Sequence, residues 1–292
     1  MRPFLSFSLL FLVIIGCIQR AYGQEEQSRE ERKLENERFD DALIEKVEDS
    51  EEPDKVLHAE PLYIDLIRDL GARKGEQEWN LGFGVLDRDG YNEIEALIEY
   101  EFAIIDRLGL EIEFPFSFFT VNEEGVVQPE NKLNSLQLAG QYTLVVSKKA
   151  KFSFAIGYLH EFEFTSFKQY GKEDLYKGNV FNPFAVAAKR WGDNFHTLIY
   201  AGPVIERLFG TGMSEIDWQI NTNLDYMISG TNNFIGIEFN KSFEDGDFDM
   251  TMRPQMRVTI DDHWMAGIVT GIPVEQENEG LSMFVRLIYE PD

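Results

Sequence analysis

From Trp79 to Tyr289 the sequence alternates between apolar and polar residues with a period of two. Its first stretch places Trp79, Leu81, Phe83 and Val85 between polar or small residues. Successive side chains of a β-strand point to opposite faces, whereas a helix repeats about every 3.6 residues. The pattern therefore predicts strands that have one apolar face and one polar face.

The alternation divides this part of the chain into about twelve strands. Their expected ranges are 77–86, 93–105, 107–119, 134–146, 151–164, 179–190, 195–208, 216–228, 233–241, 248–259, 263–272 and 280–289. Most are roughly 9–13 residues long, enough to cross a hydrocarbon layer at a tilt, whereas strands of soluble sheets usually have about 5–6 residues. A sheet in lipid leaves no edge unpaired, so the last strand must pair with the first. We predict an all-β fold, a closed antiparallel transmembrane β-barrel of about twelve strands over residues 77–292.

Short and long connections alternate between these strands. Short turns are expected at 106–107, 147–150, 192–194, 229–232 and 261–262, and longer loops at 87–92, 120–133, 165–178, 209–215, 242–247 and 273–279. Outer-membrane barrels have short periplasmic turns and longer outer loops. The alternation therefore favours the outer membrane, with the N-terminal segment in the periplasm. The expected partners are outer-membrane lipid and the barrel-assembly machinery.

The N-terminus has the pattern of a secretory signal peptide. A basic start precedes an apolar run over residues 4–18, and Ala21 and Gly23 place small residues before a cut. We predict that residues 1–23 are this signal peptide. The alternative is lipidation of Cys17, because residues 14–17 loosely resemble a bacterial lipobox.

Two further segments precede the barrel. Residues 24–57 carry fourteen acidic and six basic residues and few apolar ones, a composition that favours a disordered acidic spacer in the periplasm. In residues 58–76, Pro61 suits a first helical turn and Gly71 suits a helix end. Four apolar residues would share one face of that helix: Leu62, Leu66, Ile67 and Leu70. Such a short amphipathic helix is marginal alone, so we expect it to cap the mouth of the barrel or to enter it as a plug.

One run of residues resembles a known family. From His58 to Asn80 the sequence is His-Ala-Glu-Pro-Leu-Tyr-Ile-Asp-Leu-Ile-Arg-Asp-Leu-Gly-Ala-Arg-Lys-Gly-Glu-Gln-Glu-Trp-Asn. It resembles the N-terminal signature of a poorly characterised family of outer-membrane barrel proteins from the Bacteroidota. The resemblance implies the fold and the location, and it implies no catalytic residues.

Composition narrows the classes of function. The chain has 27 Lys and Arg against 52 Asp and Glu, a net charge of −25, so a nucleic-acid backbone would be repelled. Its single cysteine excludes a disulfide framework and a cysteine-based metal cage. Acidic loops at 87–93 and 244–247 lack the full spacing of a calcium loop and fit hairpin turns. We expect no nucleic-acid partner, no cofactor and no metal site.

Charged residues occupy the polar face of several predicted strands. The candidate lumen-lining residues are Glu95, Glu99, Glu101, Glu111, Glu113, Arg253, Arg257 and Arg286. Carboxylates at close range need countercharges, and the arginine fork suits such pairing. Two interpretations stay open. The lumen admits small polar or cationic solutes, or an ionic network fills a narrow barrel without conduction.

The predicted function is a passive outer-membrane channel or transporter for small polar or cationic solutes, or a structural membrane protein. One alternative is an exported soluble or lipid-anchored β-sandwich that binds a ligand and buries the apolar faces between two layers. Another is a barrel-embedded lipid-modifying enzyme, which requires a serine hydroxyl within hydrogen-bond reach of a histidine at the barrel rim. The sequence contains no Gly-x-Ser-x-Gly motif, and we expect no catalytic residues.

Overall fold

The computed structural model describes residues 28–291, except 50, 65, 123–124, 211, 213, 245 and 275–279. The signal peptide predicted over residues 1–23, with Cys17, lies outside the described residues. Within them the chain forms one α-helix over 28–48, an irregular segment over 51–76 and a large antiparallel sheet. Among the described residues, no helix is both long and apolar enough to span a membrane.

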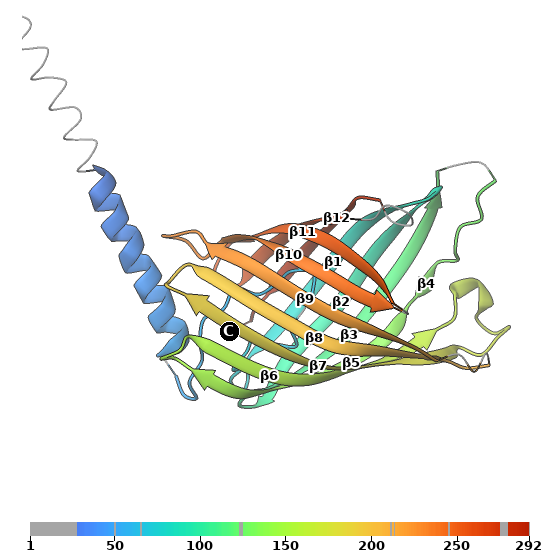
Figure 1. Cartoon of the computed structure of the whole chain (residues 1–292), viewed down its shortest axis with the longest axis horizontal. Coiled ribbons are helices and arrows are strands. Elements are labelled where there is room, and N and C mark those ends of the chain that lie inside the picture. Colours follow the sequence, from blue (N-terminus) through green and yellow to red (C-terminus); the bar gives the residue numbers. More distant parts are fainter. Residues whose placement is uncertain are drawn as a thin grey trace, which may run out of the picture.

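Twelve long antiparallel strands close into a barrel (Figure 1). They are β1 (Gln77–Arg88), β2 (Tyr91–Ile105), β3 (Leu108–Val121), β5 (Ser135–Ser147), β6 (Phe152–Phe164), β7 (Tyr176–Trp191), β8 (Phe195–Leu208), β9 (Ser214–Met227), β10 (Phe234–Glu244), β11 (Asp247–Thr259), β12 (Trp264–Pro273) and β13 (Ser282–Tyr289). A two-residue strand, β4 (Lys132–Leu133), pairs with β3, and a 3-10 helix, η1 (Phe167–Gln169), follows β6. At the closing seam β13 pairs with β1, and Tyr289 lies opposite Trp79. The predicted transmembrane barrel is therefore confirmed. The β-sandwich alternative is wrong, because one sheet closes on itself.

The predicted strands agree with the observed strands to within a few residues at each end. Two connections that were expected to be long are short instead: Asp89-Gly90 joins β1 to β2, and residues 245–246 join β10 to β11. In each hairpin the pairing continues to the turn, at Arg88 with Tyr91 and at Glu244 with Asp247. The asymmetry between the two ends of the barrel is therefore weaker than the sequence suggested. We call them the turn end, where the strands meet at 106–107, 148–151, 192–194, 228–233 and 260–263, and the loop end.

The two faces of the sheet differ as the alternation predicts. On β1, Trp79 and Phe83 point outward and are 46% and 55% exposed, whereas Glu78 and Asn80 point inward and are buried. The pairing register carries this alternation from strand to strand around the barrel. Large apolar side chains thus cover the outside, as a barrel in lipid requires, and polar side chains line the inside.

The helix over residues 28–48 projects from the turn end, where the C-terminus also lies (Figure 1). Asp40 accepts a hydrogen bond of 2.8 Å from the backbone N–H of Gly230, and Arg190 donates one of 2.5 Å to Glu48. The prediction that a short helix precedes the barrel is confirmed, but the helix lies within the stretch predicted to be a disordered spacer. Its contacts with barrel turns stabilise it, and composition alone does not reveal them.

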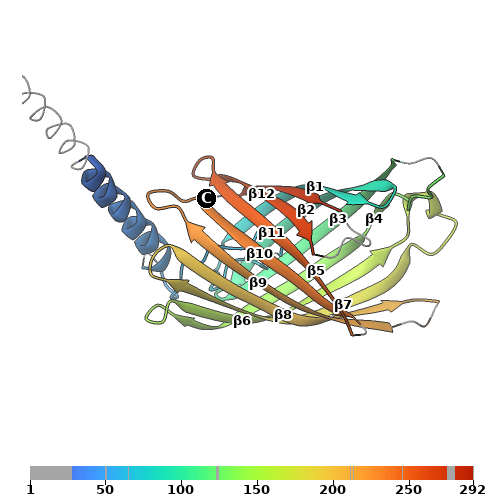
Figure 2. The ribbon, with the colours of Figure 1, turned by 45° about the horizontal axis from the view of Figure 1, so that its top comes forward.

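Residues 51–76 are here called the plug, and most of its described residues between 55 and 73 are buried inside the barrel near the turn end (Figure 2). The helix predicted over 58–76 is wrong, because the described residues of this segment are not helical. Positive φ angles at Arg68 and Gly71 interrupt any helical path. The four apolar residues that suggested the helix are buried, but they fill two separate clusters against the barrel wall: Leu66, Ile67 and Leu70 in one, and Leu62 in the other.

Candidate functional site

The barrel wall binds the backbone of the plug through side chains from several strands. Five plug N–H groups donate to barrel side chains: Ala59 to His196 Nδ1 (2.9 Å), Leu62 to Gln255 Oε1 (2.9 Å), Ile64 to Glu238 Oε1 (3.0 Å), Arg68 to Glu101 Oε2 (2.7 Å) and Gly71 to Thr143 Oγ1 (2.9 Å). These acceptors belong to β8, β11, β10, β2 and β5. Buried N–H groups require partners, and here the lumen wall supplies them in place of a helix. The plug is thus fixed from several sides of the lumen.

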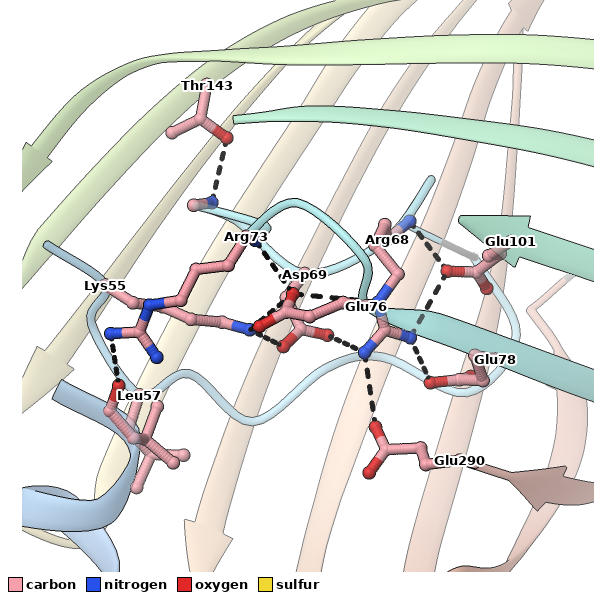
Figure 3. A network of polar contacts seen from close by, with 12 residues as sticks. Lys55, Leu57, Arg68, Asp69, Arg73, Glu76, Glu78, Glu101, Thr143 and Glu290 are labelled. Carbon is pink, nitrogen blue, oxygen red and sulfur yellow. Dashed lines mark hydrogen bonds and ion pairs between the residues drawn. The ribbon is translucent and has the colours of Figure 1, made fainter. Parts of the chain in front are cut away.

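Arg68 is the main ionic anchor of the plug (Figure 3). Its Nη1 donates to Glu78 Oε2 at 2.5 Å, and its Nη2 donates to Glu290 Oε1 at 3.3 Å. The carboxylate of Glu101 lies 3.8 Å from the guanidinium and accepts the backbone N–H of Arg68. Arg68 is only 4% exposed, so these contacts are made in a poorly solvated place. One plug residue thereby connects β1, β2 and the chain end after β13.

A second ionic group lies beside Arg68 at the base of the plug (Figure 3). The Nζ of Lys55 donates to Asp69 and, at 2.9 Å, to Glu76. Burial alone would lower the pKa of Lys55, but the charges of Asp69 and Glu76 outweigh it and hold the pKa above its ordinary value. Burial would also raise the pKa of Asp69, yet Arg68 and Lys55 keep that pKa far below its ordinary value. The positive charges of Lys55 and Arg68 and the negative charges of Asp69 and Glu76 therefore stabilise one another.

Glu60 lies close to Asp69 within the same group. Burial, and then the negative charge of Asp69, raise the pKa of Glu60 well above its ordinary value. The neutral form of Glu60 is therefore favoured beside the carboxylate of Asp69. This arrangement lets two acidic side chains pack together inside the barrel.

His58, another plug residue, lies in a buried polar cluster with Ser153, His196 and Arg190. Its Nε2 lies 3.0 Å from Ser153 Oγ. Burial, followed by the nearby His196 and Arg190, lowers the pKa of His58 to about 3, so the ring is neutral at physiological pH. The serine–histidine contact that an enzyme would need is therefore present, but Ser153 has no exposed surface. A substrate cannot reach this hydroxyl without displacing the plug.

A cavity of about 380 Å³ lies on the loop side of the plug. The plug side chains Tyr63, Ile64 and Ile67 form part of its lining. We call this cavity the cup. Its remaining lining comes from the barrel: Glu95, Ala96, Leu97, Glu111, Glu113, Pro115, Phe116, Asn134, Gln137, Leu159, Glu161, Asn182, Phe184, Tyr200, Val204, Gln219, Phe284 and Arg286. Four carboxylates and a single arginine give the cup an acidic character, and several aromatic rings give it apolar patches.

The eight candidate residues from the sequence all lie on the inward face of their strands. The register places Glu99 opposite Glu113 and Glu101 opposite Glu111. Asn80 donates to both Glu99 (2.7 Å) and Glu101 (3.1 Å), on the side of the cluster away from the cup. The cup is lined by Glu95, Glu111, Glu113 and Arg286, whereas Glu99 and Glu101 lie deeper, next to Asn80 and the plug.

The three candidate arginines, which belong to β11 and β13, lie in three different places. Arg286 lies 3.8 Å from Glu99, which is the pairing of late and early strands that the sequence led us to expect. Arg253 donates to Asn240 at 2.6 Å and covers the ring of Tyr63, with its guanidinium carbon 3.3 Å from the ring centre. Arg257 lies over the ring of Phe234, on the turn side of the plug. Only part of the candidate set thus meets at one place.

Sequence reasoning missed the residues that hold the plug. His196, Glu238 and Gln255 have the inward parity of their strands, so they could have been chosen as lumen-facing polar residues. Nothing in the alternation indicates that their partners are backbone N–H groups of residues 59–64. In the part of the chain that the structure describes, no group of three or more His, Cys, Asp or Glu side chains is arranged to hold a metal ion.

The barrel is similar to solved structures of outer-membrane channels. The COG4313 outer membrane channel from Pseudomonas putida F1 aligns with a TM-score of 0.58 and 12% identity, over 78% of this chain and 100% of that chain. The KdgM porin aligns with a TM-score of 0.50 and 16% identity, over 73% of this chain and 99% of that chain. The same porin in complex with disordered oligogalacturonate gives a TM-score of 0.50 and 15% identity at the same coverage. At these identities the likeness concerns the fold alone.

The sequence comparisons identify the family. No functionally curated protein matches the sequence. Residues 54–290, which include both the plug from Asp54 onward and the whole barrel, match the HAEPLYID-like family. The letters of that name are also the one-letter sequence of residues 58–65, which lie in the plug. Since the match covers most of the chain, this protein belongs to the HAEPLYID-like family.

Proposed function

We propose that this protein is an outer-membrane channel for small polar and cationic solutes, and that its own plug closes it. The observation that carries this proposal is the cup, an acidic cavity inside a closed barrel whose floor is the plug. Carboxylates that line a lumen favour cations and repel anions. A solute that enters from the loop end would reach Glu95, Glu111 and Glu113 before it meets the plug.

The orientation in the membrane is also part of the proposal. In outer-membrane barrels the short turns and both termini face the periplasm. The helix over 28–48 and the end of β13 both lie at the turn end, which supports a periplasmic position for the N-terminal segment. Lipid around the apolar belt and the barrel-assembly machinery are the partners that such a chain requires. Removal of a signal peptide over 1–23 and an origin in the Bacteroidota stay predictions.

The similar KdgM porin is described in complex with oligogalacturonate, an acidic oligosaccharide. The cup of the present barrel has the opposite preference, because its carboxylates outnumber its single arginine. We therefore propose that solutes of this channel differ from that ligand in charge. Cationic and neutral polar molecules are the class that the lining favours.

A structural membrane protein without transport is the second candidate. The number of bonds between plug and wall favours it, since a segment whose backbone is bonded to five barrel side chains and whose Arg68 forms ion pairs with the barrel opposes passage. A lipid-modifying enzyme has less support, because the buried Ser153 is not accessible to a substrate.

Conductance of the purified full-length protein in planar bilayers tests the channel. We expect small, cation-selective currents from the wild type, and larger ones after Arg68→Ala removes the main anchor of the plug. Reversal potentials under a KCl gradient give the selectivity. If neither protein conducts, although both show the heat-modifiable gel migration of a folded barrel, the channel proposal is wrong and the structural role is favoured.

A further inference from the structure

Glu111 is a buried carboxylate on the wall of the cup. It is 4% exposed, and none of the described residues donates a hydrogen bond to it or forms an ion pair with it. Two other inward carboxylates have a hydrogen-bond donor: Glu161 accepts from Ser135 at 3.0 Å, and Glu93 accepts from Ser117 at 2.8 Å. Glu111 is thus different from Glu161 and Glu93.

The surroundings of Glu111 make a bound cation favourable at this carboxylate. Its nearest charged neighbours in the cup, Glu113 and Glu161, are also acidic. Burial of a charged group without a compensating partner is unfavourable, and like charges add to that cost. A positively charged group bound in the cup would relieve both effects. The cup has the volume of a small-molecule site, since such sites usually begin at about 300 Å³.

Aromatic rings form another part of the lining. Phe184 and Tyr200 stack with ring centroids 4.8 Å apart, and both line the cup. The hydroxyl of Tyr200 donates to Asn182 at 2.8 Å, so this residue offers its ring rather than its hydroxyl to a ligand. The apolar side chains of Ile67 and Leu159 lie in the same lining. Aromatic faces attract ammonium groups, and apolar side chains accept a hydrocarbon body.

We propose that the cup is a binding site for an organic ammonium ion that carries an aromatic or aliphatic body, with Glu111 as the residue that binds its charge. The inference rests on the proposed channel, because it names the class of solute that the lumen accepts. A bare metal ion suits the site less well, because metal ions in proteins need several converging oxygen ligands and the described residues offer no such arrangement. The plug residues Tyr63, Ile64 and Ile67 line the same cavity, so a bound amine would lie next to the plug.

Calorimetric titration of the folded, detergent-solubilised full chain tests this site with four probes. Benzylammonium carries the ring and the charge, benzyl alcohol is a neutral counterpart, benzoate is an anionic one, and methylammonium carries the charge without the ring. We expect benzylammonium to bind at least about tenfold more tightly than each of the other three, as loss of one charged contact or one aromatic contact of about 1.4 kcal/mol implies.

Two variants with the same change of charge locate the site. Glu111→Gln keeps the shape of the side chain and should weaken benzylammonium binding about tenfold or more. Glu93→Gln is the matched control, since Glu93 faces the lumen, is bonded to Ser117 and Arg88, and does not line the cup. It should change the affinity less than about twofold. Tyr200→Leu should weaken the binding of benzylammonium more than that of methylammonium. Heat-modifiable migration confirms that each variant is folded, and Glu111→Asp serves if Glu111→Gln does not fold.

Each contrary result overturns a defined part of the proposal. Equal affinity for benzyl alcohol removes the role of charge, and equal affinity for methylammonium removes the role of the rings. An equal loss in Glu93→Gln and Glu111→Gln shows that the general negative potential, not Glu111, attracts the ligand. A protein that conducts cations but does not bind benzylammonium retains the channel and loses this inference, whereas a protein that binds the amine without any conductance loses the channel alone.

Discussion

The guanidinium of Arg68 lies 2.5 Å from the carboxylate of Glu78 and thereby joins the plug to the first strand of the barrel. Both side chains are buried. Arg68 has a φ of +63°, a left-handed conformation that costs about 1 kcal/mol or more for a residue with a side chain. This bend places the backbone N–H of Arg68 against Glu101 while its side chain reaches Glu78. The bend and the ion pairs thus depend on each other.

Replacement of Arg68 by alanine should loosen the plug. It leaves buried carboxylates of Glu78 and Glu101 without their cation, and removal of one partner of a buried ion pair usually costs about 3–5 kcal/mol. We expect faster proteolysis within residues 51–76 and a lower thermal midpoint of the folded barrel in detergent. Arg88→Ala is the control, because Arg88 pairs with Glu93 in a partly solvated position. Equal protease resistance of Arg68→Ala and the wild type would show that the ion pairs are not the anchor.

The strands of this barrel could be predicted closely from the sequence. The reason is physical: lipid on one side and polar lumen on the other impose a period of two on every strand. Register follows from the same constraint, since a shift by one residue would point Glu99 toward lipid. The two hairpins at Asp89-Gly90 and 245–246 were misjudged because acidic residues at a strand end resemble a loop.

The plug could not be predicted in the same way. Leu62, Leu66 and Leu70 have helical spacing, and a helix with one apolar face was the simplest interpretation. Inside the lumen, however, buried N–H groups can bond to wall side chains such as Gln255, so the segment does not need a helix to satisfy its backbone. Which acceptors face the lumen at the right height depends on the three-dimensional register, and no local pattern encodes it. The same reason explains why the sequence did not indicate that Glu111 has no partner among the described residues.

A disulfide between plug and wall should hold the channel closed. A Cβ atom built at Gly267 on β12 would lie 3.3 Å from Leu62 Cγ, which is close to the separation of a Cβ atom and the distal sulfur in a disulfide. No cysteine follows Cys17 in the sequence, so the pair Leu62→Cys with Gly267→Cys would react with each other. We expect oxidation to reduce conductance several-fold and a reductant to restore it.

The matched control is the pair Gly82→Cys with Leu97→Cys. These residues are direct partners on β1 and β2, so their disulfide would join two strands that are already paired and would leave the plug free. Its oxidation should not change conductance. If the plug–wall disulfide forms in full and the currents persist unchanged, solutes pass without movement of the plug around Leu62.

Gly109 on β3 gives the plug backbone room to approach the wall. A Cβ atom at this position would lie 2.1 Å from the carbonyl oxygen of Ile67 and 2.7 Å from Arg68 Cβ. Gly109→Ala should therefore displace the plug at a cost of about 1–3 kcal/mol, seen as faster proteolysis of residues 51–76. Gly140→Ala is the control, because its Cβ atom would lie 3.3 Å from Leu110 Cδ2 and 3.8 Å from the carbonyl oxygen of Gly109, and would contact no atom of the plug's described residues. Equal protection of the two variants would place the plug farther from β3.

The hold on the plug should weaken as the pH falls, and His58 should account for part of that change. Its pKa is about 3 with the plug in place and near the ordinary value of 6.5 when the plug is withdrawn. Protonation therefore favours withdrawal: the contribution of His58 is fully present above pH 6.5 and decreases by about 1.4 kcal/mol per unit as the pH falls from 6.5 toward 3. Between pH 6.5 and 5 the loss is about 2 kcal/mol.

The variant His58→Gln tests this contribution, because it keeps a polar side chain beside Ser153 and cannot titrate. Hydrogen exchange of residues 55–64 measures how well the plug is protected. This protection should depend less steeply on pH in His58→Gln than in the wild type. Asp69 and Glu60 titrate in both proteins, so their effect cancels when the two pH profiles are compared. Parallel profiles would show that His58 is already accessible to protons in the closed barrel.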